Sequence, residues 1–440
     1  MFDLAKHRHI FFFSIIILVV SATFFAVKFA QGYRIDFSSK TLKPTGLLVA
    51  TSTPPGAQVF VDGRLKTATN NTLSLSPGQY EVEIKKGGFL PWKKRLTIEK
   101  ELVTQTEAFL FPQVPDLKPL TFYEAQNPRL SPDGTRIIYA IPLADSEAKE
   151  RPTELRQLAN ESGLWIMELT DLFFNIDREP RQIVQSQLRG KDFSQANYGW
   201  SPNAKQVWVE FSSGEKYLLD PNVLNTAVSL TNVAVGWSIT VADWEKETKL
   251  REEVKLRRVP EKLQAILASN SAELNFSPDG TKILYEATAS AEIPEHLIPP
   301  VLAASTQKED REIKPGNFYV YDLKEDKNFL IPLIPLPVPS STKAPVRKSQ
   351  SPPSISAPIP LLTPHFSPIS WFPTSRHLYW IDGDKVVSCE YDGTNLSAIY
   401  SGPFEKPFVF AAPGANKLVI LTQINFDLET KFNLYAVSLR

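Results

Sequence analysis

Histidines are the first side chains to consider for chemistry, because imidazole groups bind metals and transfer protons near neutral pH. His7 and His9 have a spacing that metal ligands use, but they flank the start of a long apolar run, where solvated polar residues are the simpler interpretation. The other three histidines are far apart in the sequence: His296, His365 and His377. The sequence therefore predicts no metal site and no cofactor.

Serines and the single cysteine give no catalytic pattern either. Residues 199–203 (Gly-Trp-Ser-Pro-Asn) and 236–240 (Gly-Trp-Ser-Ile-Thr) resemble the turn that presents a nucleophilic serine, but both lack its final glycine, so turn serines are favoured. Cys389 is the only cysteine, which excludes an intrachain disulfide and fits a small buried thiol in a strand. No catalytic residue is predicted, and we expect no enzymatic activity.

Aspartates and tryptophans have structural interpretations. Residues 382–384 (Asp-Gly-Asp) and 392–393 (Asp-Gly) lack the alternating oxygen ligands of a calcium loop, so hairpin turns are favoured. Four tryptophans fall at positions of a sequence repeat that should face between its copies: Trp200, Trp208, Trp371 and Trp380. Core packing is the expected role of these rings, and no binding residue is predicted.

A repeated strand, turn and strand organises the C-terminal part of the chain. Its best copy spans residues 274–285 and contains Ser-Pro-Asp-Gly at 277–280. In that turn Pro278 presets φ, Asp279 can bond its own backbone, and Gly280 can take a positive φ. Five copies align on a proline: Pro132, Pro202, Pro278, Pro373 and Pro413. Five copies of one unit predict a repeat architecture.

The repeat resembles the propeller repeat of TolB and its relatives. The residues that carry the resemblance are the Ser-Pro-Asp-Gly turn, a basic residue four places after the proline (Arg136, Lys282 or Lys417) and an apolar triplet that follows it. Further strands follow several copies, as at 163–169 and 317–323, so each unit has at least three strands. Radial repetition protects the edges of such sheets. The resemblance implies a β-propeller over residues 118–440, and the length of that stretch allows five to seven blades, with six favoured.

The spacing between copies is uneven, because successive prolines are 70, 76, 95 and 40 residues apart, whereas a four-stranded blade needs roughly 40 to 45. Residues 233–244 are interpreted as a blade that has lost its turn, and 244–268 as a charged helix. Residues 331–364 are rich in proline and serine and predict a mobile loop. We expect the last strand, at 432–439, to complete its blade with an early strand at 120–123.

Residues 46–112 predict a separate small β-sandwich of short strands joined by Gly and Pro turns. They resemble the PEGA domain in three stretches: Pro-Pro-Gly-Ala at 54–57, Val-Phe-Val-Asp-Gly at 59–63 and Pro-Gly-Gln-Tyr-Glu-Val at 77–82. Pro55 replaces the glutamate of the family motif. The resemblance implies a spacer or binding module without chemistry of its own.

The N-terminus carries an uncharged apolar run at 10–27, long enough to cross a bilayer as a helix. We interpret residues 1–9 as a short tail, 10–30 as a transmembrane helix and 31–45 as a linker; a cleaved signal peptide is the alternative. The basic residues around the helix favour cytoplasmic domains when simply counted. Large domains translocate largely regardless of charge, so we predict the C-terminal domains on the extracytoplasmic side.

Composition adds one exclusion. Lys+Arg and Asp+Glu both count 48, which gives no reason to expect a nucleic-acid partner. The predicted fold class is all-β: an N-terminal transmembrane helix, a PEGA β-sandwich and a β-propeller. We expect a membrane-anchored cell-surface protein whose propeller binds a protein or a cell-wall polysaccharide. Two alternatives stay open, an envelope structural component and a propeller-based hydrolase or lyase with an unrecognised site.

Overall fold

A computed structural model describes residues 8–30, 33–36, 41–143, 161–170, 178–272, 274–302, 304–333, 368–424 and 431–440. The chain divides into two compact units. Unit 1 comprises Met1–Gln113 and Pro299–Lys308, and unit 2 comprises Val114–Ile298 and Glu309–Arg440. His7, His365 and most of the proline-rich segment 331–364 lie outside the described residues.

Unit 1 begins with α1 (Arg8–Ala30), an apolar helix. Its stretch Phe11–Lys28 has a mean hydropathy of 2.3 and no part of it is buried within the protein, so it is long and apolar enough to cross a membrane. A signal sequence near an N-terminus has the same properties. Two short strands follow and pair with each other: β1 (Arg34–Asp36) and β2 (Thr41–Lys43).

The rest of unit 1 is a sandwich of two sheets. One sheet has the order β6-β3-β9, from Asn71–Leu75, Gly46–Thr53 and Val103–Phe109. The other has the order β5-β4-β7-β8, from Arg64–Ala68, Gln58–Val61, Gly78–Lys85 and Trp92–Ile98. Side chains of β3 alternate between buried and half-buried, as period-two strands do. A shared core of Leu48, Val59, Ile84 and Trp92 joins the sheets.

Unit 2 contains, within its described residues, five antiparallel sheets of three or four strands, which we call blades 1 to 5. Blade 1 has β11 (Gln126–Leu130), β12 (Arg136–Ile141), β13 (Gly163–Glu168) and β14 (Arg181–Gln185). Blade 2 has β17 (Asn197–Trp200), β18 (Val207–Glu210) and β19 (Lys216–Leu219). Blade 3 has β20 (Asn275–Phe276), β21 (Lys282–Glu286), β24 (Phe318–Asp322) and β25 (Lys327–Leu330). Blade 4 has β26 (Ile369–Trp371), β27 (His377–Asp382), β28 (Lys385–Glu390) and β29 (Ser397–Ser401).

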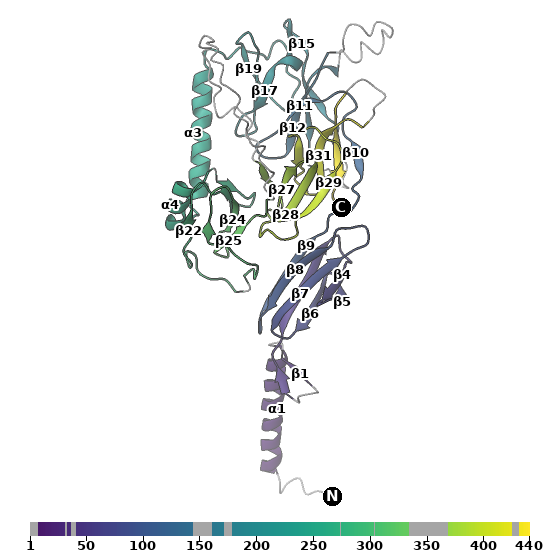
Figure 1. The fold of residues 1–440 in the computed structure, drawn as a ribbon, viewed down its shortest axis with the longest axis vertical. Coiled ribbons are helices and arrows are strands. Elements are labelled where there is room, and N and C mark those ends of the chain that lie inside the picture. The colour runs from purple at the N-terminus through teal and green to yellow at the C-terminus, as the bar shows by residue number, and fades with distance from the viewer. Residues whose placement is uncertain are drawn as a thin grey trace, which may run out of the picture. The chain divides into compact units, whose positions relative to one another are not determined.

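Blade 5 joins the two ends of unit 2. It contains β30 (Val409–Ala411), β31 (Lys417–Thr422) and β32 (Asn433–Ser438), and its fourth strand is β10 (Leu117–Pro119) from the start of the unit. Figure 1 shows β10 beside the yellow C-terminal strands, and it pairs with β32 in antiparallel register. Consecutive sheets closed by strands from both ends define a β-propeller.

One detail of the predicted propeller is wrong. The strand that pairs with β32 is Leu117–Pro119 and not 120–123, although the backbone N–H of Leu120 still donates to the carbonyl of Leu434. The described residues of unit 2 form five blades, where the sequence predicted five to seven with six favoured.

The segment interpreted as a lost blade is helical. Two helices follow blade 2, α3 (Trp237–Leu256) and α4 (Glu261–Asn270), and Pro260 occupies the N-cap position of the second. Trp237, Val241 and Trp244 lie on one helical face and pack against Trp208 of blade 2. On the other side of the insertion, Leu263 and Leu267 of α4 pack into the core of blade 3. The strand prediction for 233–244 is therefore wrong, and the charged helix predicted for 244–268 is confirmed as two helices.

Candidate functional site

The repeated turn is built as its sequence predicts. In blade 3 the Ser277 hydroxyl donates to Asp279 Oδ1 over 2.7 Å, and the backbone N–H of Thr281 donates to the same oxygen over 3.0 Å. The N–H of Lys282 donates to Ser277 Oγ over 2.9 Å, and Gly280 takes a φ of 69°. Blade 1 repeats these contacts with Ser131 and Asp133. Each turn therefore fixes where the basic residue after it begins the next strand.

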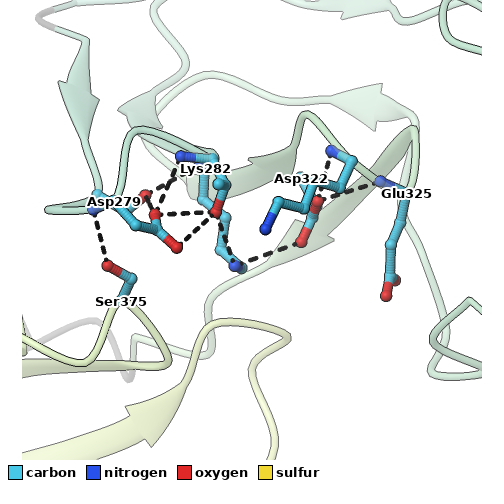
Figure 2. A network of polar contacts seen from close by, with 8 residues as sticks. Asp279, Lys282, Asp322, Glu325 and Ser375 are labelled. Atoms are coloured by element: carbon cyan, nitrogen blue, oxygen red, sulfur yellow. Dashed lines mark hydrogen bonds and ion pairs between the residues drawn. The ribbon is translucent and has the colours of Figure 1, made fainter.

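Figure 2 shows that this turn also joins blade 3 to blade 4. The backbone N–H of Asp279 donates to Ser375 Oγ, in the turn of blade 4, over 3.0 Å. Lys282 Nζ lies 3.6 Å from Asp322 Oδ2, and both side chains are buried. Lys282 Nζ also lies 4.6 Å from the centroid of the Tyr391 ring in blade 4. We call this set of contacts the interblade latch.

Polar contacts hold the charges of the latch in place. Asp322 Oδ1 accepts hydrogen bonds from the backbone N–H groups of Lys324 and Glu325. Burial would raise the pKa of Asp279, but the hydrogen bonds from Ser277 and Thr281, with the nearby Lys282 charge, outweigh it and lower this pKa to about 2. The carboxylate of Asp279 is therefore ionised at neutral pH.

A similar latch joins blades 1 and 2. The Arg136 guanidinium lies 4.9 Å from the centroid of the Trp200 ring and donates to the carbonyl of Ala204. Trp200 Nε1 donates to the carbonyl of Arg129 over 3.1 Å. At the boundary between blades 3 and 4, Trp371 Nε1 donates to the carbonyl of Asn275 over the same distance. These tryptophans are buried between blades, as their repeat positions predict.

The other residues considered for chemistry lie apart. The side chain of His296 is 78% exposed, whereas His377 is buried in blade 4. Within the described ranges, no group of three or more His, Cys, Asp or Glu side chains is placed to hold a metal ion. Cys389 is fully buried, and this burial, with the charges of Asp392 and Glu390, raises the pKa of its thiol.

The aspartates of blade 4 lie in turns. Asp382 pairs with Lys385 across a two-residue hairpin in which Gly383 has a φ of 56°. Asp392 Oδ1 accepts hydrogen bonds from the backbone N–H and the hydroxyl of Thr394 in the next hairpin. Ser201 likewise bonds to Asn203 within the turn of blade 2. Asp392 and Ser201 thus bond within backbone turns, and Asp382 ends the strand that leads into one, so each belongs to a turn as predicted.

Sequence reasoning missed the acidic partners of the latch. In three blades the basic residue that begins the second strand lies opposite an acidic residue on the third strand in the pairing register, and these pairs are Arg136–Glu168, Lys282–Asp322 and His377–Glu390. In blade 3 the two side chains are also in contact, whereas Glu168 forms ion pairs with Arg178 and Arg181. The signal was present in the sequence, because each third strand ends in an acidic residue followed by an apolar one. The spacing of residues within one repeat does not indicate which neighbouring blade a latch contacts.

Comparisons with known proteins found one family model and several solved structures similar to this chain. The family model of the PEGA domain matches residues 45–112. A putative TolB from Agrobacterium tumefaciens is 13% identical over 71% of this chain and 78% of its own, with a TM-score of 0.20. The β-propeller domain of Cps50 (Swd1) from Myceliophteria thermophila is 11% identical over 74% and 100%, with a TM-score of 0.26. TolB from Acinetobacter baumannii is 10% identical over 82% and 60%, with a TM-score of 0.19.

No curated protein matches the chain in sequence. Because the TM-scores are low, the propeller assignment rests on the sheet order and on the strand exchange in blade 5. The latch connects blades through ion pairs, ring contacts and backbone hydrogen bonds. Such contacts can hold neighbouring blades in fixed positions. The charged groups of the latch contact other groups of the protein, as Lys282 contacts Asp322 and Asp279 accepts from Ser277.

Proposed function

We propose that this protein is a membrane-anchored envelope protein whose propeller binds a protein or a cell-wall polysaccharide without catalysing a reaction. The observation that carries the proposal is the order of parts along the chain. An apolar helix that is exposed along its length precedes a PEGA domain, and a closed propeller follows. This order suits a module held away from a membrane to meet a partner.

The non-catalytic part of the proposal is supported by the way the ionisable residues are used. Lys282 and Asp322 contact each other, and Asp279 is held by three donors of its own turn. Catalytic acids and bases need a pKa near the working pH and access to a substrate proton. Asp279 has a pKa of about 2, far from that range.

Binding can be tested with residues 46–440 as bait, a fragment that retains both sheets of the PEGA domain and all five blades. We expect saturable retention of one envelope protein, or of purified cell-wall polysaccharide, from detergent-solubilised envelopes. The matched control is the same bait without residues 433–440, because removing β32 opens blade 5. Equal retention by both baits, or degradation of the offered polysaccharide or protein, would contradict the proposal.

The extracytoplasmic location can be tested with a thiol probe. Val235 is fully exposed and Cys389 is fully buried, so Val235→Cys introduces a single reactive thiol. We expect a membrane-impermeant maleimide to label this variant on intact cells, while the parent protein, with only Cys389, stays unlabelled. Labelling that requires cell lysis would place the propeller in the cytoplasm.

A further inference from the structure

The cross-strand pairs of the blades differ in one chemical respect. Arg136 in blade 1 and Lys282 in blade 3 carry charges that persist through the physiological pH range. The equivalent residue in blade 4 is His377, which faces Glu390 in register on β28. Histidine is the residue type that changes its charge between about pH 5 and 8. Blade 4 therefore carries a titratable group where blades 1 and 3 carry permanent cations.

The surroundings of His377 are closed to solvent. His377 is 5% exposed and Glu390 is 7% exposed, and Asn395 Nδ2 donates to Glu390 Oε1 over 2.9 Å. The Phe372 ring lies edge-on to the imidazole, with ring centroids 6.1 Å apart. Phe372 stands where blades 1 to 3 have the turn serine, so an aromatic contact replaces the hydroxyl network there.

Four charged residues lie close to this position along the chain, in register or through the Tyr391 ring. Glu390 lies opposite on β28, and the buried Asp392 follows in the next turn. Arg376 precedes His377, and its carbonyl accepts the N–H of Tyr391. From blade 3, Lys282 reaches the same Tyr391 ring. Burial by itself favours a neutral imidazole, and the acidic residues on this side oppose that effect, because an opposite charge nearby stabilises the charged form.

We propose that the His377–Glu390 pair is a pH-sensitive element that stabilises blade 4 when His377 is protonated and weakens it when His377 is neutral. The sign follows from the partner. A buried carboxylate that faces an imidazolium gains an ion pair, and the same carboxylate that faces a neutral ring loses it. The contribution is thus present while the imidazole is protonated and is lost as the pH rises and the imidazole becomes neutral. The inference does not depend on the proposed function.

The test compares the thermal unfolding of the full-length protein in detergent from pH 5 to 8 with that of His377→Lys. A permanent cation at this position should remove the pH dependence of stability that His377 causes. We therefore expect the ratio of the folding equilibrium constants, parent over His377→Lys, to fall about tenfold from pH 5 to pH 8. His296→Lys is the matched control, because its side chain is exposed, and it should follow the parent profile.

Two further variants keep the inference testable if His377→Lys does not fold. His377→Gln and Glu390→Gln each remove one partner, and both should flatten the difference between pH 5 and 8. Exchange of backbone amides in β27 and β28, corrected for intrinsic rates, should also rise with pH in the parent more than in these variants. If the stability of the parent changes with pH in the same way as the stability of every His377 and Glu390 variant, the inference is overturned.

Discussion

Leu434 gives the sharpest test of ring closure. It lies on β32, is fully buried, and packs in one cluster with Ile137 and Tyr139 of blade 1 and Val419 of blade 5. Its carbonyl also accepts the N–H of Leu120 from the start of unit 2. Leu434→Ala should therefore loosen the boundary between the first and last blades. Leucine-to-alanine changes in a packed core cost about 2–5 kcal/mol, and full burial places this one in the upper part of that range.

The free energy of unfolding can be measured by guanidinium titration, followed both by tryptophan fluorescence and by far-ultraviolet circular dichroism. If unit 2 unfolds as one closed ring, the two signals of that unit should shift together to lower denaturant concentration. Val228→Ala is the control, since Val228 is 94% exposed and its loss should change stability by less than about 0.5 kcal/mol. A change of that small size for Leu434→Ala, or a shift in only one signal, would refute the closure argument.

Three other variants test separate parts of the structure. Leu18→Arg places a charge in the middle of α1 and should weaken membrane retention by about 2.5–3.5 kcal/mol, measured as the fraction recovered in membranes; unchanged recovery would count against an anchor. Asp279→Asn should cost stability at neutral pH, and because the native pKa is near 2, this cost should shrink as the pH falls from about 4 toward 2 in acid unfolding curves. Gly163→Ala should lower the free energy of unfolding by about 1–3 kcal/mol, because Gly163 has a φ of 138° and an added Cβ would lie 2.1 Å from the carbonyl oxygen of Val184. Gly87→Ala is the control, and it should leave the free energy of unfolding unchanged, because there is open space around Gly87.

Local turn chemistry was readable from the sequence, and the choice between helix and strand was not. Ser277, Asp279 and Gly280 interact within six residues, so their sequence fixes the turn wherever it occurs. Residues 233–241 place Val, Val, Trp, Ile and Val at alternate positions, which is the period of a strand. The segment is helical instead, because a helix places Trp237 and Trp244 on one face, where both pack in one cluster with Trp208. This arrangement leaves Ile239 exposed.

The latch was only half predictable for a similar reason. The basic residue of each repeat was visible, because it follows the turn at fixed spacing. Its partners come from other strands and from the next blade, as Ser375 and Tyr391 do for Asp279 and Lys282. Pairings of this kind depend on how the blades follow one another in space, and a single sequence with one ragged repeat does not contain that order.

The strand exchange in blade 5 also determines how the protein would carry mechanical load. β10 is the first strand of unit 2, so tension carried along the backbone from Gln113 enters the unit beside it, and the segment 299–308 of unit 1 gives the backbone a second connection to unit 2. Only three residue pairs, from Leu117–Val437 to Pro119–Tyr435, join β10 to β32, with further hydrogen bonds at Leu120 and Ala125. A pull strong enough to peel β10 away would expose one edge of β32, while β32 stays paired with β31 and β31 with β30. The strand that closes the ring is thus also the first strand of unit 2 that tension along the backbone from Gln113 would load.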